Sequence, residues 1–216
     1  MSKPESTAVI SIEELMKKQV AENAGRFSTS GSTKISVSDK KFTFPDKTEI
    51  KGKPIEVIVI DFINTNTLYN GPYKPGNVAP PLCAAVGREE ATMVPRASIE
   101  DPVSPTCAVC PKNAWGSGNG NGKACSNKVL MVVAKPDDLA GELYTIEASA
   151  TAIKDFAKYI NQLGTVETTC WGVITTISFS DDSFPSLRFK LAAKCTSEQA
   201  LAAYGRQEEA FKMLMA

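Results

Sequence analysis

The sequence predicts a mainly β protein with flanking helices, in which an irregular insertion interrupts one small domain. Segments with alternating apolar and polar residues occur on both sides of the middle of the chain. Apolar residues at helical spacing occur near both ends. Residues 64–128 show neither periodicity. A length of 216 residues suits one large domain, or one domain with an insertion.

Residues 1–33 are expected to form a loose tail followed by one helix. Ser11 and Glu14 form a capping-box pattern, in which the serine caps free N–H groups and the glutamate reaches back to the helix start. Gly25 marks the expected end of this helix. Its apolar residues at helical spacing are Ile12, Leu15, Met16 and Val20.

Strands are expected to begin the main domain, which should span residues 34–196. Alternation predicts strands at 34–39 and 41–46, and the β-branched run at 54–63 is typical of a central strand. Three strands in succession indicate an antiparallel meander. An insertion at about 64–128 then interrupts the domain, and a segment of this length without periodic structure needs something functional or cross-linking to order it.

Strands and helices resume after the insertion. The patterns predict strands at 128–134 and 141–149, a helix at 150–164, and a strand pair at 170–182 and 184–194. A C-terminal helix is expected at 197–216, with Ser197 as its cap. Roughly half a dozen short strands favour a Greek-key barrel of the OB-fold type. The alternative is a split α+β sheet.

The composition excludes several classes of function. Histidine is absent, which removes histidine-based triads and every zinc site that contains histidine. The net charge is zero, so bulk charge does not support nucleic-acid binding, and such a ligand needs a local basic patch. The sequence has no apolar run of membrane-spanning length and no secretory signal pattern, so a cytoplasmic location is expected.

The cysteines within the insertion suggest a metal site. A Cys-x2-Cys pair places two thiolates about one tetrahedral ion, and two further cysteines complete a four-thiolate shell. Zinc suits this donor set, and as a closed shell it would be structural, contributing on the order of 10 kcal/mol to folding. The proposed ligands are Cys83, Cys107, Cys110 and Cys125.

Other interpretations of this segment remain open. The cysteines are alternatively scattered free thiols, or ligands of an iron–sulfur cluster. A thioredoxin-like pair is less favoured, since no strand-to-helix context surrounds Cys107 and Cys110. A phosphate-binding loop is also less favoured, because Ala124 follows Lys123 where a Ser or Thr should reach magnesium. The glycines are better explained as residues that allow tight turns.

Aromatic and basic residues suggest binding to single-stranded nucleic acid, which needs ring faces for stacking and cations for the backbone. Tyr69 and Tyr73 flank a turn, and Trp115 lies within the insertion. The candidate cations are Lys34, Lys41, Lys112, Lys123, Lys128, Arg188 and Lys190. Trp115 could instead pack over the metal shell, and Arg188 and Lys190 could be a solvated strand face. We expect core positions for Phe42, Phe44, Phe179 and Phe189.

Several motifs resemble those of bacteriophage single-stranded-DNA-binding proteins. These motifs read PPLC, SPTCAVCPKNAWGSG, GKAC and VITTISFSDDSFPSLRFK, and the similarity runs from about Ile35 to Lys194. The arrangement is similar to the replication proteins of this type in T4-like phages, where a zinc subdomain interrupts an OB-fold. The metal site of those proteins includes a histidine, which this chain lacks. It also lacks the acidic C-terminal tail common among such proteins.

The resemblance implies a protein that binds single-stranded DNA without sequence specificity during phage replication or recombination, with structural zinc and no enzymatic activity. The alternative is a zinc-containing interaction protein that engages a phage or host polymerase, or another replication or transcription protein. A third hypothesis is a nuclease that uses Asp61, Asp181 and Asp182, although these acids are more simply explained as a strand end and a turn.

Overall fold

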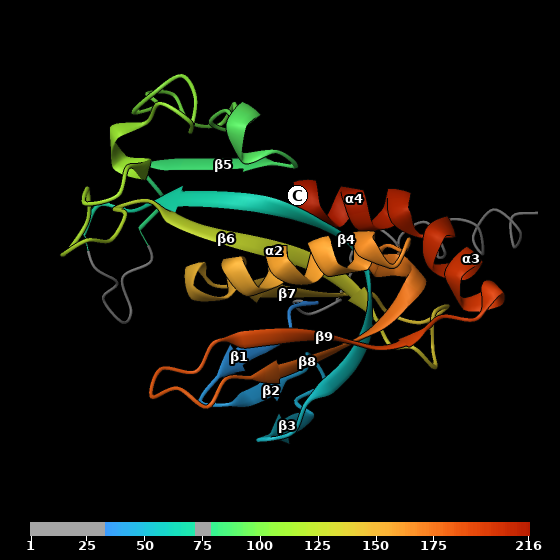
Figure 1. Ribbon diagram of the computed structural model, residues 1–216. Helices are drawn as coiled ribbons and strands as arrows, with labels where there is room; N and C mark the ends of the chain where they lie inside the picture. The colour runs from blue at the N-terminus through green and yellow to red at the C-terminus, as the bar shows by residue number, and fades with distance from the viewer. Residues whose placement is uncertain (1–32, 72–78) are drawn as a thin grey trace, which may run out of the picture. The chain divides into compact units, whose positions relative to one another are not determined.

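The computed structural model describes residues 33–71 and 79–216. The capping box and helix expected near the N-terminus lie outside these residues. The described part of the chain is mixed α/β, with two mainly antiparallel sheets and three α-helices (Figure 1). It contains no closed barrel, so the expected Greek-key barrel is not present in its closed form.

A small sheet contains three short strands in the order β1-β2-β3. These strands are β1 (Ser36–Ser38), β2 (Lys41–Thr43) and β3 (Glu49–Lys51). The prediction of a three-stranded antiparallel meander is therefore confirmed. Its third strand is β3, however, and not the β-branched run at 54–63. That run is too apolar on both faces for a small sheet, and it lies at the centre of the larger one.

The larger sheet has six strands, in the order β7-β6-β4-β8-β9, with β5 paired to β4. Its central strand β4 pairs with β8 through its first residues, with β6 along most of its length, and with β5 through its last residues. A register shift between Val59 and Asp61 marks a bulge, which bends a strand. The strands are β4 (Ile55–Leu68), β5 (Cys83–Gly87), β6 (Ser126–Ala134), β7 (Tyr144–Ala148), β8 (Val173–Phe179) and β9 (Leu187–Lys194).

The insertion is shorter and more regular than its sequence suggests. Strand β4 continues to Leu68, β5 lies inside the expected insertion, and β6 begins at Ser126. Two 3-10 turns, Glu90–Thr92 and Pro111–Asn113, add further local structure. The second half of β4 carries polar side chains, so its sequence lacks the apolar alternation that predicts a strand. Pairing with β5 and β6 stabilises this part of the strand.

Helix α2 (Ala150–Thr165) packs against β6, β7 and β9. It therefore contacts both β7 and β9, the first and last strands in the order of the larger sheet. One of its carboxylates, on Asp155, accepts a hydrogen bond of 3.2 Å from the backbone N–H of Phe189. This contact satisfies a donor on the outer edge of β9, with which no strand pairs among the described residues. The helix predicted at 150–164 is confirmed, and it ends one residue later, at Thr165.

The sheet separates two apolar clusters, because alternate residues of β4 point to opposite faces. Val57 and Val59 face a cluster that includes α2 and the small sheet, whereas Ile58 and Ile60 face the C-terminal helices. Phe42 and Phe189 are buried in the first cluster, with Phe44 and Phe179 packed against it. The expected core positions of these four phenylalanines are confirmed.

The C-terminal segment forms two helices where the sequence predicts one. They are α3 (Ser197–Gly205) and α4 (Gln207–Met215), separated at Arg206. The guanidinium of Arg206 donates to the carbonyl oxygens of Leu139 and Gly141 at 2.8 and 2.6 Å, which anchors the break. The cap of α3 is Thr196, and Ser197 is the first helical residue.

Candidate nucleic-acid and metal sites

The cysteine-bearing insertion has a small apolar core of its own. Ala85, Met93 and Cys107 form a buried cluster, and the N–H of Cys107 donates to the carbonyl oxygen of Met93 at 2.9 Å. The N–H of Arg96 donates to the carbonyl oxygen of Ala84 at 2.8 Å. Packing and backbone pairing thus order part of this segment.

Backbone hydrogen bonds bring the later cysteines near one another. The N–H of Cys125 donates to the carbonyl oxygen of Lys112 at 2.9 Å, which joins Cys125 to the turn that follows Cys110. The N–H of Cys110 donates to the carbonyl oxygen of Cys107 at 3.4 Å, as in a Cys-x2-Cys knuckle. Cys83, the first residue of β5, is the remaining member of the predicted set.

The pKa values of Cys83 and Cys125 are raised, partly by charge on the other thiols. Burial raises the pKa of Cys125 to about 11, and negative charge on Cys107, Cys110 or Cys83 contributes to the rise. Burial also raises the pKa of Cys83, and negative charge on Cys107 and Cys110 adds to this rise. A bound divalent cation would reverse this balance, because it favours the thiolate form.

This donor set suits zinc in its chemistry, although its arrangement is not a closed shell. Across residues 33–71 and 79–216, no three Cys, Asp or Glu side chains are grouped so that they could hold a metal ion. Cys107 and Cys110 share one turn, and their charges help to raise the pKa of Cys83 and of Cys125, which come from two other segments. Zinc at these four cysteines therefore stays a prediction.

The glycine-rich loop holds Trp115 outward. Gly116 and Gly120 adopt positive φ angles of 82° and 60°, which only glycine adopts readily, and this confirms their expected role in turns. Trp115 is 80% exposed, so it does not pack over the cysteines. The Lys123 ammonium lies 5.4 Å from the centre of its ring, and Lys112 is exposed nearby in sequence.

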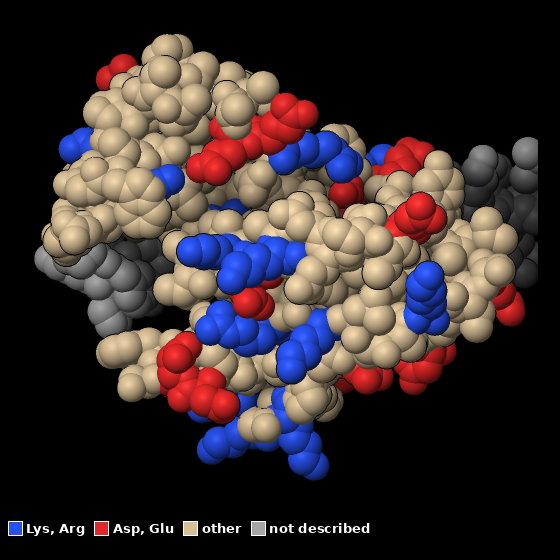
Figure 2. All heavy atoms as spheres, in the orientation of Figure 1, with Lys and Arg blue, Asp and Glu red and all other residues tan. Residues whose placement is uncertain are grey.

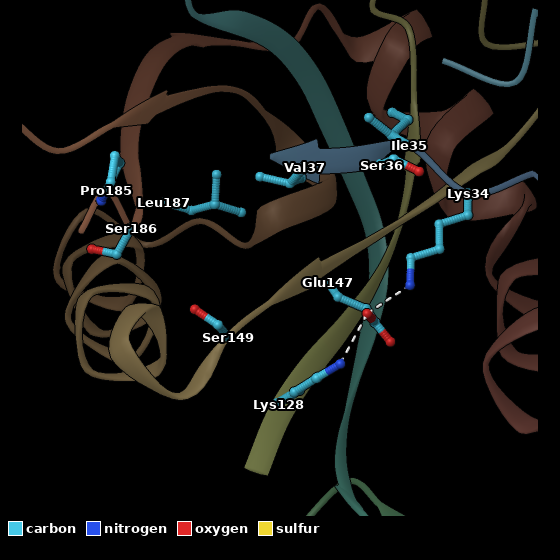
Figure 3. A pocket seen from close by; sticks show the side chains of 10 residues that line it. All are labelled: Lys34, Ile35, Ser36, Val37, Lys128, Glu147, Ser149, Pro185, Ser186 and Leu187. Carbon is cyan, nitrogen blue, oxygen red and sulfur yellow. Dashed lines mark hydrogen bonds and ion pairs between the residues drawn. The ribbon is translucent and has the colours of Figure 1, made fainter. Parts of the chain in front are cut away.

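A second candidate site is a pocket of about 380 Å³ beside β6 and β7. Lys34 and Lys128 point toward Glu147 on one side of it, and Pro185, Ser186 and Leu187 line the opposite side (Figure 3). Ser149, the residue before α2, also lines the pocket. The pocket thus joins segments that are far apart in sequence, and it brings together two of the predicted cations.

Strand geometry explains why Glu147 meets these lysines. Tyr144, Ile146 and Ala148 of β7 belong to the core cluster, so Glu147 points to the opposite face of the strand. On the neighbouring β6, Leu130 is the register partner of Glu147, and Lys128 lies two residues earlier. The other lysine, Lys34, enters beside Thr145 through an isolated parallel bridge.

The charges in the pocket perturb the glutamate. Burial by itself would raise the pKa of Glu147, but the hydrogen bond from Lys34 and the positive charges of Lys128 and Lys34 outweigh it. The pKa of Glu147 is therefore below its ordinary value, and the carboxylate is charged at neutral pH.

The remaining predicted cations and rings are dispersed. Lys41 forms an ion pair of 2.6 Å with Glu49 on the small sheet. Arg188 lies 3.3 Å from Asp182 and 3.7 Å from Asp155, whereas Lys190 is exposed on β9. Tyr69 follows β4 and is 53% exposed. Tyr73 lies outside the described residues.

Sequence reasoning missed one exposed ring and two cations. Phe184 is 91% exposed in the loop between β8 and β9, next to Pro185 of the pocket. Lys154 and Lys158 are exposed on α2, and Figure 2 shows basic side chains gathered over α2 and β9, with acidic ones among them. A phenylalanine in a polar, Pro-containing turn, and two lysines four residues apart on a helix, are the signals that could have identified them.

The carboxylates considered for a nuclease do not meet. Asp61 forms an ion pair with Arg88, while Asp181 and Asp182 lie in the exposed loop after β8. These acids are not part of any metal-holding group within the described residues.

Comparison with family models, with curated proteins and with solved structures finds no match to this chain. Among its described helices, none is long and apolar enough to cross a bilayer.

Proposed function

We propose that this chain binds single-stranded DNA without sequence specificity, through base stacking and phosphate contacts. The observation that carries this proposal is the exposure of three large aromatic rings. Trp115 and Phe184 are 80% and 91% exposed, and Tyr69 is 53% exposed. Exposed rings of this size cost solvation free energy in a free protein, and stacking on any base recovers about 1–3 kcal/mol each.

The strand order supports the proposal, because it is compatible with an OB-fold whose barrel is open. Numbered along the chain from β4, and without β5, the five main strands lie in the order 3-2-1-4-5, with a helix between the third and fourth. An OB-fold is a partly open five-stranded Greek-key barrel. Helix α2 occupies the opening between β7 and β9.

The location of the rings and the pocket agrees with this interpretation. OB-folds bind oligonucleotides on the face of strands 2 and 3 and through the loops between strands 1 and 2 and strands 4 and 5. Lys128 and Glu147 lie on the corresponding strands, β6 and β7. Trp115 and Phe184 lie in the two corresponding loops, which Figure 1 shows toward the same end of the sheet as the C-terminal end of β4.

The protein needs local cations, because its net charge is zero. The pocket supplies Lys34 and Lys128, the insertion supplies Lys112 and Lys123, and α2 with β9 supplies the cluster of Figure 2. Cations distributed in this way would contact backbone phosphates without reading bases. Salt would then weaken binding as counterions are released.

The proposal includes a structural zinc ion held by Cys83, Cys107, Cys110 and Cys125. Zinc would cross-link the loop of Trp115 to β5 and so stabilise the presentation of the ring. From the resemblance to phage proteins we propose that this activity serves DNA replication or recombination in the cytoplasm of a bacterial host.

The proposal is tested by fluorescence polarisation with labelled oligonucleotides at two salt concentrations. Binding should be tighter to single strands than to duplexes of the same length, similar for mixed sequences, and weaker at higher salt. Equal or stronger binding to duplex DNA would refute the proposal.

A second candidate, an interaction protein for a polymerase or another replication or transcription protein, is favoured by the C-terminal helices. Their exposed apolar residues offer a contact surface for such a partner, since exposed apolar patches mark protein interfaces. A partner that copurifies after nuclease treatment, together with weak oligonucleotide binding, would favour this alternative. The exposed residues are Leu201, Tyr204, Phe211 and Met215.

A further inference from the structure

Two ammonium groups in the pocket converge on a single oxygen atom. The Nζ atoms of Lys34 and Lys128 lie 2.7 and 3.2 Å from Oε2 of Glu147 (Figure 3). We propose that this carboxylate occupies the position of a backbone phosphate, and that single-stranded DNA must displace it to bind the two lysines. The inference rests on the proposed function and concerns the affinity of the same site.

The geometry of the lysines supports an oxyanion site. Ammonium groups bind a carboxylate oxygen and a phosphate oxygen with similar N–O distances, so the position of Oε2 marks where both lysines can serve one oxyanion. The pocket of about 380 Å³ beside them leaves space for an external group. Hydroxyl groups of Ser36, Ser149 and Ser186 line it, and these can also donate to phosphate oxygens.

Glu147 can be displaced because it is not a deeply buried partner. Its side chain is 31% exposed, and those of Lys34 and Lys128 are 45% and 39% exposed. Ion pairs with this exposure contribute little to stability, about 0–1 kcal/mol. The carboxylate therefore contributes little to the free energy of unfolding. It lowers the affinity for DNA, because it neutralises one of the two positive charges and repels an approaching phosphate.

The consequence is a binding site whose affinity is held below the value that its lysines alone would permit. Such a site releases DNA more readily, since the carboxylate can return to the lysines as the phosphate leaves. The same arrangement disfavours adventitious small anions, which cannot draw on the stacking interactions of Trp115 and Phe184.

The experiment compares Glu147→Gln with wild type by fluorescence polarisation of a labelled single-stranded oligonucleotide across several salt concentrations. Glu208→Gln is the matched control, because Glu208 also pairs with a lysine, Lys212, at 2.8 Å but lies outside the pocket. Glu147→Gln should bind roughly three- to tenfold more tightly at low salt. Its log–log salt dependence should steepen by about 0.7 for each lysine released.

A double variant, Glu147→Gln with Lys128→Ala, should lose most of this gain while keeping the fold, as judged by circular dichroism. If wild type binds DNA and Glu147→Gln binds it with the same affinity, the inference is wrong and the proposed function stands. Weaker binding in Glu147→Gln also overturns it, since the carboxylate would then be contacting the DNA itself. Absence of binding by both proteins overturns the inference and the proposed function together.

Discussion

The guanidinium of Arg88 donates two hydrogen bonds to the carboxylate of Asp61, at 3.1 and 2.6 Å. Asp61 lies at the bulge of β4 with its side chain only 9% exposed, and Arg88 directly follows β5. The same guanidinium lies 5.2 Å from the centre of the Phe211 ring on α4. One arginine thus connects the central strand, the start of the insertion and the C-terminal helix.

Arg88→Ala should therefore destabilise the protein. It leaves the buried carboxylate of Asp61 without its main partner, which costs about 1–3 kcal/mol. Urea unfolding monitored by circular dichroism measures the change. Lys212→Ala, which removes an exposed pair with Glu208, is the control and should leave the midpoint unchanged. Equal midpoints for the two variants would contradict a structural role for Arg88.

Purified protein should contain one zinc ion per chain when it is prepared anaerobically. Cys110→Ser should lose the metal, since three thiolates do not complete the shell. Cys195→Ser should keep it, because Cys195 follows β9 and lies outside the predicted set. Elemental analysis gives the stoichiometry, and wild-type protein without zinc would refute the metal assignment. Iron in place of zinc would instead favour the cluster alternative.

Alanine substitution of the exposed rings should weaken binding to oligonucleotides of every base composition. Trp115→Ala, Phe184→Ala and Tyr69→Ala should each lower affinity roughly 5- to 100-fold, as expected for one lost stacking contact. The matched control is Tyr204→Ala, because Tyr204 on α3 is also an exposed tyrosine, at 57%, but lies against Trp171. Unchanged affinity in all three ring variants would refute the stacking assignment.

Stability should fall in alkaline solution because of Cys170. Burial raises the pKa of this thiol to about 11, above the ordinary value of 9.0. The folded state therefore keeps a proton that the unfolded state has lost between these pH values, so stability is lost as pH rises from about 9 toward 11. At pH 10 this thiol should lower the free energy of unfolding by about 1.4 kcal/mol.

Urea unfolding of wild type and Cys170→Ala at pH 8 and pH 10 tests this expectation. The variant lacks the thiol, so its stability should change less between the two pH values. Parallel losses in both proteins would show that other groups cause the alkaline effect.

The local elements were largely predictable from the sequence. Alternation identified β2, an apolar run identified β6, and helical spacing identified α2. The buried positions of Phe42 and Phe189 followed from their place in apolar patterns. These features depend on neighbours within a few residues, which a single sequence displays directly.

Pairing between distant segments was not predictable in the same way. Strands β3 and β5 are short and only partly apolar, and they exist because β2 and β4 supply their hydrogen-bond partners. The break at Arg206 depends on carbonyl oxygens near Gly141, more than sixty residues earlier in the chain. Helix propensity along 197–216 gives no sign of that contact.

The features of the candidate site also fall into these two groups. The sequence by itself determined the spacing of the cysteines, the glycine turns beside Trp115 and the inventory of basic residues. Only the tertiary structure decided that Lys34 and Lys128 share one oxygen of Glu147, that Arg188 is paired with acids, and that Phe184 is exposed beside the pocket. The reason is that periodicity reports the face of a local element, whereas the meeting of charges 113 residues apart depends on how the strands and loops assemble.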